Sequence, residues 1–177
     1  MGRTGARGEV RRRPMMVKYA PEELAAWHRD LLRYGHRLTG EADVAEDLAQ
    51  EAMLRLLRSP AEARPDNPRA WLYRVLTNLV RDRARSLDRV QRKYVPIDTD
   101  EPPTPSADFE RREIVARVRA VLERLTPRDQ EMLILRESGF QHSEIAHIVG
   151  VKPQSVSVLL SRALERFKAA YLSEAAL

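Results

Sequence analysis

Residues 143–162 read SEIAHIVGVKPQSVSVLLSR, and this stretch decides the fold that we expect for the C-terminal part of the chain. Ser143 is the expected N-cap of a short helix that ends at Val149, and Pro153 begins a longer helix. Gly150 can adopt the left-handed conformation that the corner between them requires. The pattern predicts a helix-turn-helix, whose second helix can lie in the major groove of DNA.

The apolar residues of this stretch support the same interpretation. Ala146 is small at the point where the two helices would cross closely, and the expected apolar clamp consists of Ile145, Ile148, Val151 and Val156. The N-terminal side chains of the second helix would then face base edges. An ordinary helical hairpin, which any bundle can contain, is the alternative.

Upstream of this motif, helical signals continue to residue 114. Thr126-Pro127 predicts an N-cap followed by proline at the first helical position, in a helix that ends near Glu137. Before it, apolar residues recur at helical spacing at Ile114, Val118, Val121, Leu122 and Leu125. We therefore expect a small C-terminal helical domain at residues 111–177.

A change of composition separates this domain from the rest of the chain. Residues 95–110 are rich in proline and acidic residues, and they predict an extended linker that cannot fold alone. Residues 1–18 are basic and without apolar periodicity, which predicts a flexible tail. A supplementary phosphate-binding arm is the alternative interpretation of the tail.

Residues 19–94 form the expected N-terminal domain. Apolar spacing predicts helices over residues 21–39, 42–58 and 68–92, with Gly40 and Ser59-Pro60 as the ends of the first two. The predicted fold is therefore all-α, with two small helical domains joined by an extended linker.

Composition narrows the possible functions. The 177 residues contain no cysteine, so disulfides, thiolate metal sites and cysteine nucleophiles are excluded. No apolar run approaches the length of a membrane span, so we expect no membrane insertion. The net charge of +5 suggests a polyanionic partner.

Charge is distributed unevenly within the N-terminal domain. Residues 55–93 carry eleven basic residues against four acidic ones, near aromatic side chains that can stack on bases. Trp71 and Tyr73 can equally be core residues. All charged residues in the segment 40–51 are acidic, namely Glu41, Asp43, Glu46, Asp47 and Glu51. This acidic surface is better interpreted as a docking face for a basic partner than as a Mg²⁺ site.

In this order, the motifs resemble those of the extracytoplasmic-function (ECF) sigma factors of bacteria. Residues 45–51 (AEDLAQE) are similar to the core of sigma region 2.2, and residues 67–74 (NPRAWLYR) to regions 2.3 and 2.4. Residues 125–133 (LTPRDQEML), with 144–146 (EIA) and 161–163 (SRA), resemble region 4. The resemblance covers roughly residues 20–172.

The resemblance implies a transcription initiation factor without catalytic activity or cofactor, acting in the cytoplasm. Its implied partners are core RNA polymerase (the β′ clamp helices and the β subunit), promoter DNA and an anti-sigma factor. The residues implied to dock on polymerase are Asp47, Gln50 and Glu51. Those implied to bind the melted −10 element are Arg64, Asn67, Trp71, Arg74, Asn78, Arg81 and Arg85.

The helix-turn-helix would bind the −35 element as duplex, with Gln154, Ser155, Ser157 and Arg162 as its contacts. The sequence departs from the family here, since relatives often carry Lys and Arg at the positions of Ser157 and Leu159. Fewer basic side chains predict weaker phosphate attraction and readout through DNA shape. The competing hypotheses are a dimeric regulator that binds DNA alone and a helical Mg²⁺-dependent pyrophosphatase.

Overall fold

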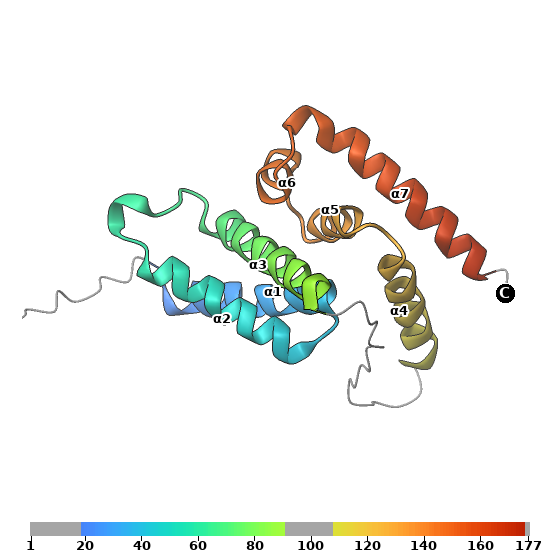
Figure 1. Ribbon diagram of the computed structural model, residues 1–177, viewed down its shortest axis with the longest axis horizontal. Coiled ribbons are helices and arrows are strands. Elements are labelled where there is room, and N and C mark those ends of the chain that lie inside the picture. Colours follow the sequence, from blue (N-terminus) through green and yellow to red (C-terminus); the bar gives the residue numbers. More distant parts are fainter. Residues whose placement is uncertain (1–18, 91–107, 176–177) are drawn as a thin grey trace, which may run out of the picture.

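The computed structural model describes residues 19–90 and 108–175 (Figure 1). Within these ranges all regular elements are helical: α1 (Pro21–Thr39), α2 (Ala42–Arg58), the 3₁₀ turn η1 (Ala61–Ala63), α3 (Pro68–Val90), α4 (Asp108–Glu123), α5 (Pro127–Glu137), α6 (His142–Val149) and α7 (Pro153–Ala175). The expected all-α fold is therefore confirmed. The tail at residues 1–18 and most of the predicted linker lie outside the described residues.

The first two helices have the predicted bounds because local signals determine their ends. Pro21 occupies the first position of α1, where its missing N–H costs no hydrogen bond. Gly40 ends α1 with a φ of 73°, and its N–H donates to the carbonyl of His36 at 2.8 Å. Ser59, in an extended conformation before Pro60, ends α2.

The starts of the C-terminal helices partly differ from prediction. Thr126 caps α5 as expected, since its Oγ1 accepts from the Asp129 N–H at 3.2 Å. The expected Ser143 cap of α6 is wrong, because the helix already begins at His142 with Gln141 as N-cap. There the Glu144 carboxylate accepts from the Gln141 N–H at 2.8 Å, so the acid three residues on determines the start. Helix α4 begins at Asp108, so residues 108–110 of the predicted linker are helical.

Helices α1, α2 and α3 pack on one another, as do α5 and α6, while α7 packs on α4, α5 and α6 (Figure 1). The two domains also touch, because α3 packs on α6 and α1 on α5. Their buried side chains form one continuous cluster. In it, the ring of Tyr73 on α3 lies 4.7 Å from that of Tyr34 and 4.6 Å from that of Phe140, between centroids. Sequence analysis did not predict this shared core.

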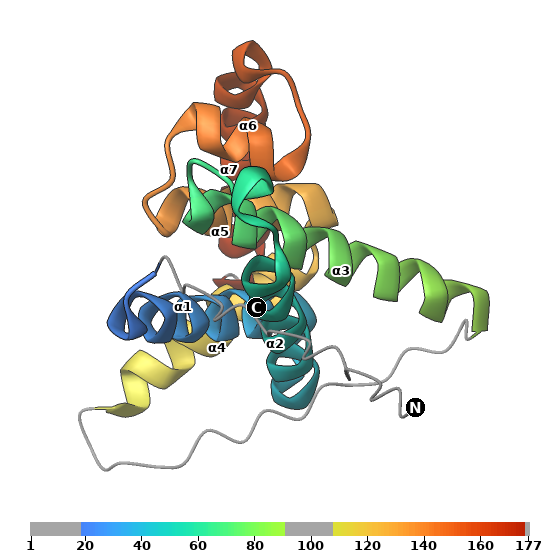
Figure 2. The same ribbon diagram turned by 90° about the vertical axis from the view of Figure 1, so that its left-hand side faces the viewer.

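The far end of α3 leaves the shared core and projects from the body of the molecule (Figure 2). Residues 82–87 are all exposed there. In the part of the chain that the structure describes, no helix is long and apolar enough to cross a membrane.

Candidate nucleic-acid interface

Asn67 connects the start of α3 to the C-terminal domain. Its Oδ1 accepts from the Ala70 N–H at 3.0 Å, which satisfies one of the unpaired donors at the helix start. Its amide nitrogen donates to Glu144 Oε1 on α6 at 2.9 Å. This predicted −10 residue therefore has both a capping role and an interdomain contact.

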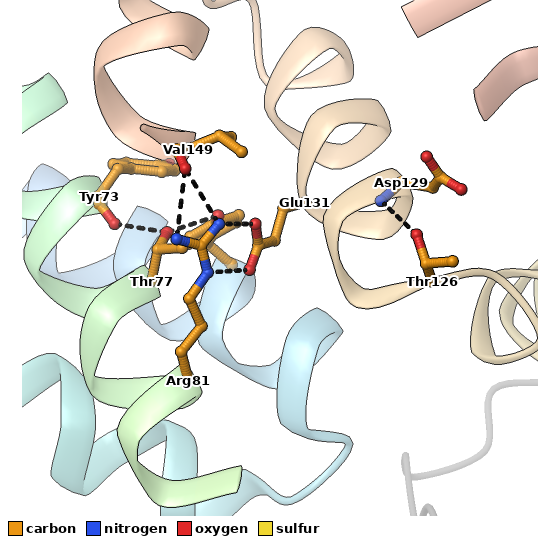
Figure 3. Close-up of polar contacts among 8 residues, drawn as sticks. Tyr73, Thr77, Arg81, Thr126, Asp129, Glu131 and Val149 are labelled. Atoms are coloured by element: carbon orange, nitrogen blue, oxygen red, sulfur yellow. Dashed lines mark hydrogen bonds and ion pairs between the residues drawn. The ribbon is translucent and has the colours of Figure 1, made fainter. Parts of the chain in front are cut away.

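Arg81, also predicted to bind the −10 strand, makes the most extensive interdomain contact (Figure 3). Its Nε and Nη2 donate to the two carboxylate oxygens of Glu131 on α5, at 2.9 and 2.5 Å. Nη1 and Nη2 also donate to the Val149 carbonyl at the end of α6, at 3.3 and 3.2 Å. The Glu131 side chain is 3% exposed and that of Arg81 32%. This hydrogen bond to Glu131 raises the pKa of Arg81, so the guanidinium stays charged.

Further polar contacts flank this pair. Arg74 Nη1 lies 3.2 Å from Nε2 of His147 on α6. Arg69 donates to the Ser138 carbonyl at 3.0 Å, and its guanidinium lies 4.2 Å from the centroid of the Phe140 ring. An ion pair also joins Arg37 of α1 to Glu137 of α5. Basic side chains of α1 and α3 thus contact the C-terminal domain at several points.

The inner face of α3 is held by a buried hydroxyl network. Tyr34 Oη and Thr77 Oγ1 are 2.9 Å apart, and Thr77 Oγ1 donates to the Tyr73 carbonyl at 2.8 Å. Burial raises the pKa of Tyr34 and of Tyr73, so both phenols stay neutral. Tyr73 is a core residue, and the guanidinium of Arg69, one turn before it on α3, lies 5.6 Å from the centroid of its ring.

The remaining predicted −10 residues are spread over α3 and the loop before it. Asn78 is exposed, and Trp71 is half-buried against the core cluster. Arg85 donates to Asp82 Oδ1 at 2.6 Å on the projecting end of α3. Arg64 is half-buried in the loop before α3. The structure therefore places the predicted −10 residues on α3 and in the loop before it. Asn78 and Arg85 are exposed to solvent. Asn67, Arg74 and Arg81 contact the C-terminal domain.

The predicted docking residues lie on α2, and Asp47 is exposed. Gln50 donates to Glu46 at 3.2 Å, and Glu51 accepts from Arg55 at 2.7 Å. Each contact joins two side chains one turn apart on α2. On a helix surface such a pair contributes roughly 0.2–0.5 kcal/mol to the stability of the helix. They can be exchanged for partners on another protein at little cost. Among the described residues, no three acidic or histidine side chains gather where they could hold a metal ion.

The helix-turn-helix has the predicted geometry. Gly150 turns the chain with a φ of 79°. Of the predicted clamp, Ile145, Ile148 and Val156 are buried, and Val151 is partly buried against the same cluster. Ala146 is 3% exposed at the crossing. Of the predicted −35 contacts, Gln154, Ser157 and Arg162 are exposed and Ser155 is half-buried. Helix α7 therefore presents a free surface along its first three turns.

Sequence reasoning missed Glu131, the buried acid that binds Arg81. A signal for it exists: Glu131 shares a helix face with Ile134 and Leu135, both buried, and an acid on an apolar face needs a cationic partner. Asp129 is similar, since it is buried and accepts from Arg166 of α7 at 2.8 Å within the C-terminal domain. Neither partner can be identified from spacing along the chain.

Comparison with known families assigns both domains. Residues 24–90 match the family model described as Sigma-70 region 2, and residues 116–167 match that described as Sigma-70, region 4. The two matched segments include α3 and the helix-turn-helix, respectively.

Several curated proteins are similar over most of this chain. The ECF RNA polymerase sigma factor SigE of Mycolicibacterium smegmatis is 31% identical over 153 residues, covering 83% of this chain and 60% of SigE. SigG of Mycobacterium tuberculosis is 32% identical, covering 77% of this chain and 44% of SigG. The chain thus spans about half the length of these relatives. EcfG of Rhodopseudomonas palustris is 32% identical over 75% of this chain and 74% of its own length.

Solved structures show the same fold. The sigma factor RpoE in complex with the anti-sigma factor NepR, from Bartonella quintana, has a TM-score of 0.65 at 22% identity, and it covers 84% of this chain and 94% of its own. The sigma factor SigJ of M. tuberculosis has a TM-score of 0.56 at 27% identity, over 83% of this chain and 53% of its own.

Proposed function

This chain belongs to the ECF sigma factors, and we propose that it directs core RNA polymerase to promoters by recognising a −35 element as duplex and a −10 element as melted strand. In this role the protein is not an enzyme, because the polymerase carries out the chemistry. It would act in the cytoplasm. The proposal assigns two different surfaces of the chain to nucleic acid, namely the helix-turn-helix to duplex and α3 to the melted strand.

The observation that carries the proposal is the helix-turn-helix with a free recognition helix. Gln154, Ser157 and Arg162 are exposed along one side of α7, and Gln154 lies in its first turn. An amide can bind the edge of adenine, and a guanidinium can bind a phosphate or guanine. We assign these residues and Ser155 to the −35 duplex.

We assign the −10 element to α3 and the loop before it. Flipping a base out of a duplex costs a few kcal/mol, roughly 2–5, which a pocket and aromatic stacking can offset. Arg64, Asn67 and Trp71 would form that pocket. Arg74, Asn78, Arg81 and Arg85 would hold the strand along one side of α3.

We assign polymerase docking to the acidic face of α2, where Asp47, Gln50 and Glu51 would meet arginines of the β′ clamp helices. Asp47→Arg and Glu51→Arg are expected to abolish copurification with core polymerase, because reversed charges repel a basic partner. Glu22→Arg, at an exposed acid of α1, is the matched control and is expected to copurify normally. Normal copurification of both α2 variants would remove this assignment.

An anti-sigma factor is a further partner that we propose. Two structures similar to this chain contain NepR: the RpoE complex already described, and the PhyRSL–NepR complex from Sphingomonas sp. Fr1, with a TM-score of 0.58.

Run-off transcription on genomic fragments tests the function itself. Core polymerase with this protein is expected to yield discrete transcripts that core polymerase alone does not yield. Asn78→Ala and Arg81→Ala are expected to lower open-complex formation more than they lower promoter duplex binding. Equal losses in both assays would contradict the strand-melting assignment, and unselective transcription on every template would contradict the function.

A further inference from the structure

We propose that Val158 on α7 reads a thymine of the −35 element, by placing its side chain against the 5-methyl group of that base in the major groove. The inference rests on the proposed function, which lays α7 on the duplex, and it names a base that this helix selects. Val158 is an addition to the four polar residues assigned to the −35 element.

The side chain of Val158 points away from the core of the domain. It is 52% exposed, whereas Val156 and Ala163, on the opposite side of α7, are fully buried. At 100° per residue, the directions of Gln154, Val158 and Ser161 around the helix lie within about 60° of one another. All three residues are exposed. Val158 therefore lies on the face of α7 that the proposed function turns toward DNA.

The surroundings of Val158 on α7 are polar. Single exposed apolar side chains are common on protein surfaces, so exposure alone assigns no role. Side chains three and four residues apart are neighbours on a helix surface. For Val158 these neighbours are Gln154, Ser155, Ser161 and Arg162. On α7, Val158 thus stands alone and does not belong to an apolar patch of the kind that a protein partner covers.

A valine at this place has one base to recognise. Thymine presents a methyl group in the major groove, and apolar side chains contact it there. Valine is branched at Cβ and keeps one preferred χ1 rotamer in a helix, so its methyl groups are already held in place before DNA binds. The hydroxyls of Ser155 and Ser157 can bond to several bases, and they discriminate less.

The start of α7 lacks the side chains that most often bind guanine. Residues 153–161 contain no arginine and no lysine. The first charged residue of the helix is Arg162, about 14 Å along its axis from Pro153. The base-selective contacts of the first two turns therefore come from Gln154, whose amide suits adenine, and from Val158, which suits thymine.

Helix geometry limits the distance between the two bases. Gln154 and Val158 are four residues apart, which is about 6 Å along the helix axis. Successive base pairs of a duplex are separated by about 3.4 Å. We therefore expect the thymine to lie within about two base pairs of the adenine that Gln154 binds.

Uracil provides the direct test, because it lacks the 5-methyl group of thymine and keeps the same hydrogen-bonding groups. Core polymerase carrying this protein first selects −35 duplexes from a randomised pool, and each thymine of the selected duplex is then replaced by uracil. One replacement is expected to weaken binding about fourfold, the effect of one buried methyl group. In Val158→Ala the same replacement is expected to have no effect. A methyl group that acted only through DNA shape would keep its effect in Val158→Ala, and this outcome would overturn the proposal.

Leu172→Ala is the matched control, because it also truncates an exposed apolar side chain of α7, at a position far from the first turns. This variant is expected to keep the full uracil effect. Loss of the uracil effect in both variants would overturn the proposal, since the effect would then not depend on contact with residue 158.

The selection itself separates this inference from the proposed function. Repeated with Val158→Ala, it is expected to lose the preference for thymine at one position and to keep the preferences at the others. Failure of the unchanged protein to enrich any duplex would contradict the proposed function. An enriched duplex in which no uracil weakens binding would contradict the role of Val158 alone.

Discussion

Helices α3 and α7 invite comparison, because each has 23 residues, begins with proline and carries residues assigned to DNA. The arginine face of α3 is covered by the other domain, whereas the corresponding side of α7 is open. Helix α3 carries Arg81, which binds the buried Glu131, and Arg74, which lies against His147, whereas the first two turns of α7 contain no arginine. The comparison teaches that a surface basic enough to bind a strand is also basic enough to bind its own chain.

The largest effect is expected from the core beneath α3. Tyr73→Ala should lower the free energy of unfolding by about 3–5 kcal/mol, since it removes a buried ring that packs on both domains. Denaturant unfolding measures the loss. Val156→Ala, beneath α7, deletes less volume within one domain and should cost clearly less. Equal losses would contradict the role of Tyr73 in joining the two domains.

A second comparison separates the two DNA surfaces. Asn78→Ala on α3 should lower open-complex formation, and Gln154→Ala on α7 should lower duplex binding, each by about 1–3 kcal/mol for a lost base contact. Permanganate footprinting and duplex gel shifts measure the two effects. If both variants lose the same step, the division of labour between α3 and α7 is wrong.

The turn before α7 provides a smaller test. Gly150→Ala puts a side chain at a φ of 79°, which costs roughly 1–2 kcal/mol even though no neighbour obstructs the new methyl group. Thermal unfolding should show this loss, together with weaker duplex binding. Lys152→Ala, exposed in the same turn, is the control and should change stability by less than about 0.5 kcal/mol.

The smallest effect is expected at the projecting end of α3. Arg85 pairs with Asp82, and both side chains are about two-thirds exposed, so Arg85→Gln should change stability by less than about 1 kcal/mol. Strand binding should nevertheless lose roughly one unit of its salt dependence, since one phosphate contact disappears. Lys168→Gln on α7 should leave that dependence unchanged. A lower stability without a change in salt dependence would assign Arg85 to the fold alone.

Helix ends could be predicted from the sequence wherever a single residue controls them. Pro21, Gly40 and Thr126 each act through their own backbone or hydroxyl, so the ends of α1 and the start of α5 were predicted correctly. At α6 two caps competed, and the reach of the Glu144 carboxylate to Gln141 decided against Ser143.

The helices that carry the candidate site were predictable from the sequence, but their arrangement was not. The arginines of α3 follow from charge and helical spacing, and the geometry of the helix-turn-helix follows from its apolar clamp. The contact of Arg81 with Glu131 joins residues 50 positions apart, and no local rule places them together. Such a contact depends on the relative position of two domains, which residue spacing does not encode.

The Val149 carbonyl has a consequence for mutational mapping. Its acceptor oxygen belongs to the backbone, so every residue type at position 149 presents the same atom to Arg81. Val149 is also buried, so Val149→Ala would report lost packing while this hydrogen bond stays in place, and an alanine scan of α6 does not measure the bond. Related chains that carry another apolar residue at this position would retain the bond, so a sequence alignment would not reveal it.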